Sequence, residues 1–89
     1  MIKRTKLEIL KDILKIIQEN HGRMKPTPLL RKSNLSSKRF QGYFEEMLKK
    51  GFVKEAEEKG NKFVVIQEKG ARFLERYKTI VSFINEFEL

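Results

Sequence analysis

The stretch RKSNLSSKRF, residues 31–40, places two pairs of cationic side chains around a polar centre. Arg31 and Lys32 precede the centre, and Lys38 and Arg39 follow it. No acidic residue lies anywhere between positions 20 and 44. Lys and Arg neutralise phosphate oxygens, and Lys, Arg and Gln also hydrogen-bond to the edges of bases. The chemistry open to these residues is therefore recognition of a polyanion.

The distribution of charge along the chain supports the same interpretation. The net charge is +8 over 89 residues, and residues 1–50 hold 13 Lys and Arg against 5 Asp and Glu. Residues 51–89 hold 7 of each kind and are neutral. A one-sided basic field attracts DNA, RNA or an acidic membrane surface. The alternative is a Lys-rich solvated face that has no partner.

Several classes of protein are not favoured by the sequence. The chain has no Cys, which rules out disulfides and thiolate metal sites and fits the reducing cytoplasm. No stretch approaches the roughly 18 apolar residues of a membrane span, and the first residues lead into charged ones instead of a signal-peptide core. His21 is the only histidine, and no nucleophile has a plausible base nearby. We expect no enzymatic activity, cofactor, metal, small-molecule ligand or membrane partner.

The elements that must position the cationic residues begin with a helix over about 6–20. Thr5 and Glu8 have the spacing of a capping box, in which each side chain bonds the other residue's amide. The apolar residues recur at three and four, with Ile9 and Ile16 widening the face that consists of Leu7, Leu10, Ile13, Leu14 and Ile17. Gly22 can take the left-handed conformation that ends a helix.

Two further helices are expected on either side of a corner at 33–35. Thr27 before Pro28 is typical of a cap followed by the first helical residue, which predicts a short helix over 28–33. Asn34 tolerates the turn conformation, and Ser36 or Ser37 caps a third helix that Gly51 closes. One side of that helix is apolar and carries Phe40, Tyr43, Phe44, Met47 and Leu48.

The rest of the chain predicts a β-hairpin and a fourth helix. Residues 52–57 and 62–66 are strand-like, with a hairpin turn at 58–61. From about residue 68 the period is again helical. The order of elements predicts an α+β fold, a helix-turn-helix with the hairpin as its wing over residues 1–67 and a C-terminal dimerisation helix over 68–89. The N-terminal part of the third helix would then face a DNA major groove.

The chain resembles a known group in these same elements. The matching pieces are TKLEILKDIL at 5–14, SNLS at 33–36, YFEEMLKKGF at 43–52 and EKGARFL at 68–74. They resemble the archaeal winged helix-turn-helix domains of small predicted transcriptional regulators and of chromatin-associated dimers with a long C-terminal helix. The resemblance implies DNA binding as a homodimer, with the third helix as the reading helix.

The candidate DNA contacts come from the corner, the third helix and the wing tip. The predicted contacts are Arg31, Lys32, Ser36, Ser37, Lys38, Arg39, Gln41, Gly42, Lys59, Asn61 and Lys62. Lys38 and Gln41 are the candidate base readers, whereas Arg39 is a phosphate contact and Gly42 allows close approach of the DNA. Arg31 and Lys32 would also favour the helix dipole, and Ser36 is first a cap. Glu45 and Glu46 limit the contact to the first turns of the helix.

The fourth helix carries an apolar stripe that a small domain cannot easily cover. The predicted dimerisation residues are Tyr77, Ile80, Val81, Ile84 and Phe87, which continue the stripe from Phe73 at spacings of three and four. Self-association would cover them, and packing of the whole helix onto the first helix is the alternative. For function, a transcriptional regulator, a weakly specific architectural chromatin protein and a protein-interaction module all remain open.

Overall fold

The computed structural model describes residues 4–89 and begins with helix α1, Lys6–Glu19. The predicted capping box is present: Thr5 Oγ1 accepts a hydrogen bond from the Glu8 amide at 3.2 Å, and Glu8 Oε1 accepts one from the Thr5 amide at 3.3 Å. The buried face of α1 consists of Ile9, Leu10, Ile13, Leu14 and Ile17. The assignment of Leu7 to this face was wrong, because Leu7 lies in the first turn beyond the core and is 56% exposed.

The turn after α1 leads into a strand that the sequence did not predict. His21 and Gly22 both adopt left-handed backbone, with φ of 63° and 83°, which reverses the chain after Asn20. Strand β1, Arg23–Met24, then pairs antiparallel with a later strand, β3 (Asn61–Ile66), through Arg23–Val65 and Met24–Val64. Two residues are too short for a period-2 pattern to be visible in the sequence.

Helices α2, Pro26–Ser33, and α3, Ser37–Lys49, form the predicted helix-turn-helix. Asn34 makes the corner with left-handed backbone at φ 60°, and the Ser36 side chain caps α3 by accepting from the Arg39 amide. The predicted start of α2 was wrong. Lys25 holds the cap position and Thr27 lies inside the first turn. Both prolines fit there because the first four amides of a helix have no intrahelical partner.

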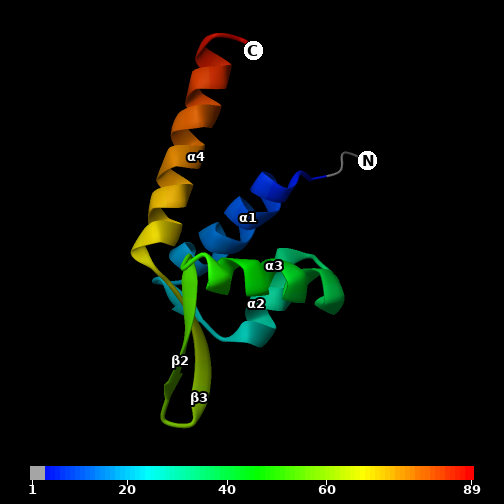
Figure 1. Ribbon diagram of the computed structural model, residues 1–89, viewed down its shortest axis with the longest axis vertical. Coiled ribbons are helices and arrows are strands. Elements are labelled where there is room, and N and C mark those ends of the chain that lie inside the picture. Colours follow the sequence, from blue (N-terminus) through cyan, green and yellow to red (C-terminus); the bar gives the residue numbers. More distant parts are fainter. Residues whose placement is uncertain (1–3) are drawn as a thin grey trace.

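The wing consists of β2, Val53–Glu58, and β3. Lys59 and Gly60 join the two strands with φ of 51° and 79°, the paired positive values of a tight hairpin turn. The strand order is β1-β3-β2, so β3 is central and the hairpin extends beyond β1. Figure 1 shows the wing projecting from one end of the molecule, with α4 projecting from the other.

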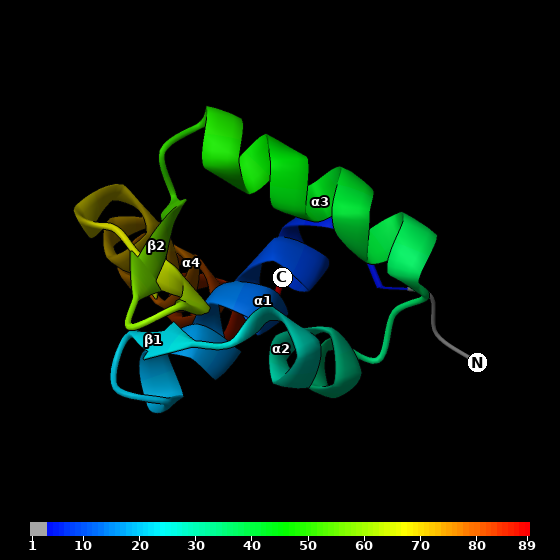
Figure 2. The ribbon, with the colours of Figure 1, turned by 90° about the horizontal axis from the view of Figure 1, so that it is seen from below.

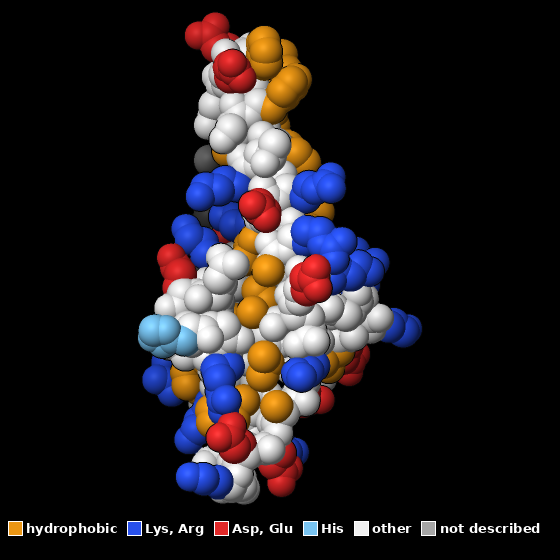
Figure 3. Space-filling model, turned by 90° about the vertical axis from the view of Figure 1, so that its left-hand side faces the viewer, with side chains coloured by type: hydrophobic (Ala, Val, Ile, Leu, Met, Phe, Trp, Pro, Cys, Tyr) orange, Lys and Arg blue, Asp and Glu red, His pale blue; other side chains and the backbone are white. Residues whose placement is uncertain are grey.

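Helix α4, Glu68–Glu86, has two unlike halves. Its first half packs on the domain, where the Phe73 ring lies 5.2 Å from that of Phe52. Gly70 is buried there, and a Cβ at this position would lie 2.3 Å from the Phe52 carbonyl oxygen. Every residue from 78 to 89 is exposed, and Figure 3 shows apolar side chains along this free end.

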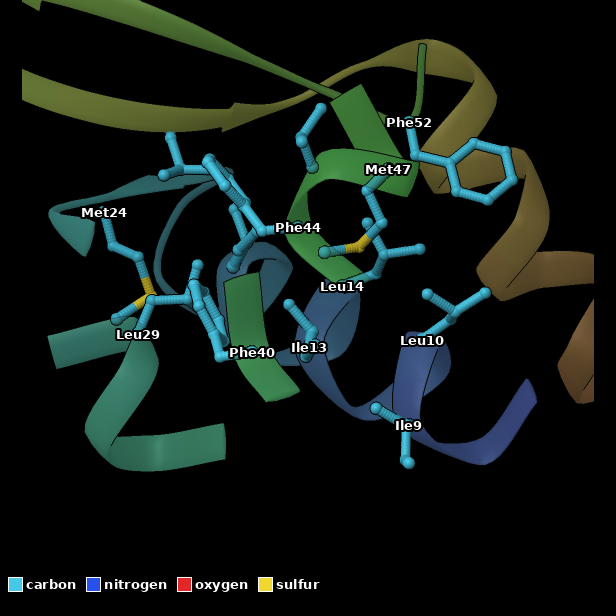
Figure 4. Close-up of a cluster of buried hydrophobic side chains, with 13 residues drawn as sticks. Ile9, Leu10, Ile13, Leu14, Met24, Leu29, Phe40, Phe44, Met47 and Phe52 are labelled. Atoms are coloured by element: carbon cyan, nitrogen blue, oxygen red, sulfur yellow. The ribbon is translucent and has the colours of Figure 1, made fainter. Parts of the chain in front are cut away.

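The core lies where α1, α2 and α3 meet the sheet. Figure 4 shows side chains from α1, α2 and α3 converging there, and the Phe40 and Phe44 rings stack at 5.6 Å. The buried apolar residues are Ile9, Leu10, Ile13, Leu14, Ile17, Met24, Leu29, Phe40, Phe44, Met47, Phe52, Val53 and Val64. These side chains fix α3 by its apolar side, so its other side faces outward. The predicted α+β winged helix-turn-helix is confirmed.

Candidate nucleic-acid interface

The start of α3 presents its polar residues to solvent as predicted. Figure 2 shows α3 along one edge of the domain, on the opposite side of α1 from α2 and β1. The exposed residues from the cap onward are Ser36, Ser37, Lys38, Arg39, Gln41 and Gly42. This side of the helix can therefore meet a large partner without any rearrangement of the core.

The cationic side chains of this region have no acidic partners in the part of the chain that the structure describes. Over residues 4–89, no carboxylate lies within 4.0 Å of the charged nitrogens of Arg31, Lys32, Lys38 or Arg39. Arg31 and Lys32 occupy the last turn of α2, where their charge also favours the helix dipole. All four charges are thus available to an external anion.

Gly42 has no packing reason to be glycine. A Cβ built at this position meets no atom within 4 Å in the described chain, and the residue sits between two shallow hollows on the surface of α3. Glycine inside a helix is about 1 kcal/mol less favourable than alanine. No packing contact within residues 4–89 accounts for the glycine, and it leaves the helix backbone bare on the exposed side of α3.

Two carboxylates share the α3 surface with the cations, and each is held by a specific neighbour. Gln41 Nε2 donates to Glu45 Oε1 at 3.1 Å. Glu46 Oε1 pairs with Lys6 Nζ at 2.9 Å, while Glu46 Oε2 is buried and has no hydrogen-bond partner within residues 4–89. The spacing of four residues within one helix is enough to indicate the first contact, whereas the Lys6–Glu46 pair joins two different helices and has no such signal in the sequence.

Arg4 is a positioning residue that the sequence analysis missed. Its guanidinium donates to Asp12 Oδ2 at 3.0 Å and to the Ser33 carbonyl oxygen at 3.2 Å, so it joins α1 to the end of α2. Burial raises the pKa of Asp12, but hydrogen bonds from Lys11 and Arg4 outweigh burial and hold that pKa below its usual value. Arg4 therefore links Asp12 in α1 to Ser33, the last residue of α2, next to the corner of the helix-turn-helix.

The wing tip carries the predicted polar residues but is close to neutral. Lys59, Asn61 and Lys62 are exposed, and Lys62 lies directly across the hairpin from Glu57. Arg23 in β1 reaches along the wing to Glu58 at the end of β2, where the two form an ion pair at 2.8 Å, and its guanidinium lies 4.1 Å from the centre of the Phe63 ring. The wing tip is thus less positively charged than the start of α3.

The apolar stripe of α4 forms a second uncovered surface. Its exposed large hydrophobic residues are Ile80, Val81, Phe83, Ile84 and Phe87, with Ile80 and Phe87 each 57% exposed. Tyr77 differs from the other predicted dimerisation residues. Its ring stacks on Phe73 at 6.4 Å and lies 5.5 Å from Lys11 Nζ, so it contacts the domain itself.

Other kinds of site find little support in the described chain. Within residues 4–89, no group of three or more His, Cys, Asp or Glu side chains is placed to hold a metal ion. None of the described helices is both long and apolar enough to cross a bilayer.

Comparisons with known proteins agree with this geometry. A family model described as winged helix-turn-helix matches residues 3–85. The fold is similar to that of Sso10a-2, a DNA-binding protein from Sulfolobus solfataricus, with a TM-score of 0.75 and 20% identity over 96% of this chain and 86% of that one. It is also similar to F93 from STIV, described as a winged-helix DNA-binding protein, with a TM-score of 0.74 and 18% identity over 89% and 91%. For F-93 of SSV1 the TM-score is 0.68 and the identity 26% over 90% and 88%. No curated protein sequence matches significantly.

Proposed function

The chain belongs to the winged helix-turn-helix family, and from this premise we propose that it binds duplex DNA as a homodimeric transcriptional regulator. The observation that carries the proposal is the exposed start of α3, where cations without acidic partners surround a glycine that packing does not require. In helix-turn-helix proteins this part of the second helix of the motif enters the major groove. Two of the similar structures are described as DNA-binding proteins.

Within this proposal the side chains have different tasks. Lys38 and Gln41 would contact base edges, because both lie on the exposed side of α3 and carry groups that can hydrogen-bond to bases. Arg31, Lys32 and Arg39 would contact phosphates, together with Ser36 and Ser37 at the start of the helix. Lys59, Asn61 and Lys62 would touch the backbone beside the groove. The proposal gives the protein no enzymatic role. The protein would act in the cytoplasm, where it would bind DNA.

The dimer is the second part of the proposal. In the proposed dimer, α4 would pack against α4 of a second copy. The seam between the two helices would contain Ile80, Val81, Ile84 and Phe87. Burying one large apolar side chain contributes roughly 1.5–3 kcal/mol, so a few per subunit suffice for a stable dimer. A two-fold axis would place two α3 helices on one side of the duplex, ideally about one helical turn apart.

A salt titration tests whether DNA binding is electrostatic. If a dimer contacts about 6 phosphates, the logarithm of the affinity should fall against the logarithm of salt with a slope near −5, and a fourfold rise in salt should weaken binding about a thousandfold. Fluorescence anisotropy with a labelled duplex measures the slope. A flat response, or no binding at low salt, would contradict DNA binding and favour a protein-interaction module.

The architectural alternative differs from the regulator in sequence preference alone. It is supported by the small number of candidate base readers on α3 beside the larger set of phosphate contacts. Selection of bound sequences from a random duplex pool, followed by competition with random DNA, separates the two functions. A regulator should enrich a defined site, whereas an architectural protein should be displaced equally well by any duplex.

A further inference from the structure

The hydrogen bond between Gln41 and Glu45 limits what the Gln41 amide can offer to a base. A carboxylate only accepts hydrogen bonds, so the amide nitrogen, and not the amide oxygen, faces Glu45 at 3.1 Å. The two residues are one helical turn apart on the exposed side of α3, where such pairs meet naturally. One of the two Nε2 hydrogens is therefore engaged within the protein, and the contact favours one orientation of the amide.

What remains free on Gln41 is one N–H donor and the carbonyl oxygen. Adenine presents one acceptor, N7, and one donor, N6, in the major groove, which matches one donor and one acceptor. Guanine presents two acceptors, N7 and O6, and a bidentate contact with it needs two donors. With one donor held by Glu45, Gln41 can make the adenine contact in full but the guanine contact only in part.

We propose that Glu45 is a positioning residue that sets base specificity by holding Gln41 in the orientation that reads adenine in preference to guanine. This inference rests on the proposed DNA-binding function of α3. Glu45 is exposed and stays hydrated, so its charge need not be neutralised within the protein. It also repels phosphates, so Glu45 should increase selectivity while it decreases overall affinity. A residue that only supported the helix would not change these two quantities in opposite directions.

The test compares Glu45→Ala and Glu45→Gln in the 89-residue protein. Duplexes carry the selected site with adenine or guanine at each position in turn, and anisotropy gives the affinity for each. The wild type should prefer adenine at one position of each half-site by roughly 5- to 150-fold. Glu45→Ala should lower this ratio by roughly 1.5- to 2.5-fold, the size expected for an exposed pair one turn apart, and should strengthen binding to random DNA. Glu45→Gln still offers an amide oxygen to Gln41, so it should keep most of the preference while it also binds random DNA more tightly.

Two further variants make the outcome decisive. Gln41→Ala should abolish the adenine preference, whereas Glu46→Gln removes the same charge one residue along and should leave the ratio unchanged, because Glu46 pairs with Lys6. An adenine preference that is unchanged in Glu45→Ala, or that survives Gln41→Ala, would overturn the inference, as would a wild type without such a preference. Salt-dependent binding to random DNA would persist in those cases, whereas loss of all DNA binding would refute the proposed function itself. Circular dichroism confirms that each variant is folded.

Discussion

The start of α3 and the end of α4 are both left uncovered by the fold, yet they differ in charge and in polarity. The α3 surface is cationic and polar, and its apolar side is fixed in the core through Phe40 and Phe44. The end of α4 is apolar and exposed, and it carries no Lys or Arg after Lys78. One surface is suited to an anion and the other to a second apolar surface. Under the proposed function, recognition and assembly would therefore lie on different helices of a small domain.

The largest expected effect comes from a charge in the α4 seam. Ile84→Asp should dissociate the dimer and weaken DNA binding roughly 100-fold or more, because two linked half-sites reinforce each other. Sedimentation equilibrium and anisotropy measure the two effects. Asn85→Asp adds the same charge at the next residue, off the stripe, and is the matched control. A wild type that stays monomeric at tens of micromolar would contradict the proposed seam.

The next effect should divide the α3 surface into base readers and phosphate contacts. Lys38→Ala and Gln41→Ala should each lower the preference for the selected site over random DNA by roughly 1–3 kcal/mol. Arg31→Ala, Lys32→Ala and Arg39→Ala should weaken binding to all sequences alike and reduce the salt slope. Anisotropy with both duplexes distinguishes these patterns. Equal behaviour of the two sets would favour the architectural role.

A smaller effect should come from the two glycines inside helices. Gly42→Ala should stabilise the fold by about 0.5–1 kcal/mol, since a Cβ meets nothing there, and should weaken DNA binding if the duplex approaches closely. Gly70→Ala should instead destabilise the fold by about 1–3 kcal/mol, because its Cβ would overlap the Phe52 carbonyl. Urea unfolding measures both. Unchanged DNA binding in Gly42→Ala would remove the case for close approach.

The smallest effect concerns the ion pair between Arg4 and Asp12, which lies beside the corner of the helix-turn-helix. Because the pKa of Asp12 is lower in the folded protein, its contribution to stability is present above its unfolded pKa, near 3.8, and is lost as the pH falls through the lower folded value. Asp12→Asn should cost less than about 1 kcal/mol at neutral pH and should reduce the acid sensitivity. Urea unfolding at pH 7 and pH 3 tests this, and an equal loss for wild type and variant would contradict it.

The elements most open to prediction were those determined by neighbouring residues. The Thr5–Glu8 capping box, the corner at Asn34 and the hairpin follow from local hydrogen bonds and backbone preferences, and the structure confirms them. Strand β1 depends instead on pairing with β3, some forty residues later, and its two residues show no pattern of their own. Local chemistry was therefore sufficient for most of the fold and insufficient for its long-range pairing.

In the candidate site, too, some features could be predicted from the sequence and others could not. The exposed side of α3 could be predicted because the apolar residues of that helix determine which side is buried. The polar contacts between different elements could not be predicted, because they depend on how those elements pack together. Arg4 reaches the end of α2, Lys6 reaches Glu46, and Arg23 covers Phe63. Whether the exposed residues contact DNA stays a prediction.

The short β1 strand divides the wing into two parts of unequal stability. It pairs with β3 only at Val64 and Val65, so the outer rungs of the hairpin, from Ala56–Phe63 to Glu58–Asn61, are hydrogen-bonded on one side alone. A two-stranded ribbon with few buried side chains opens more readily than a three-stranded sheet. Backbone amides in the outer part of the hairpin, from Ala56–Phe63 to Glu58–Asn61, should thus exchange with deuterium well before those next to β1 at Val64 and Val65. The Arg23 side chain still links β1 to this outer part through Glu58 and the Phe63 ring, so the tip should move as far as that exposed contact allows.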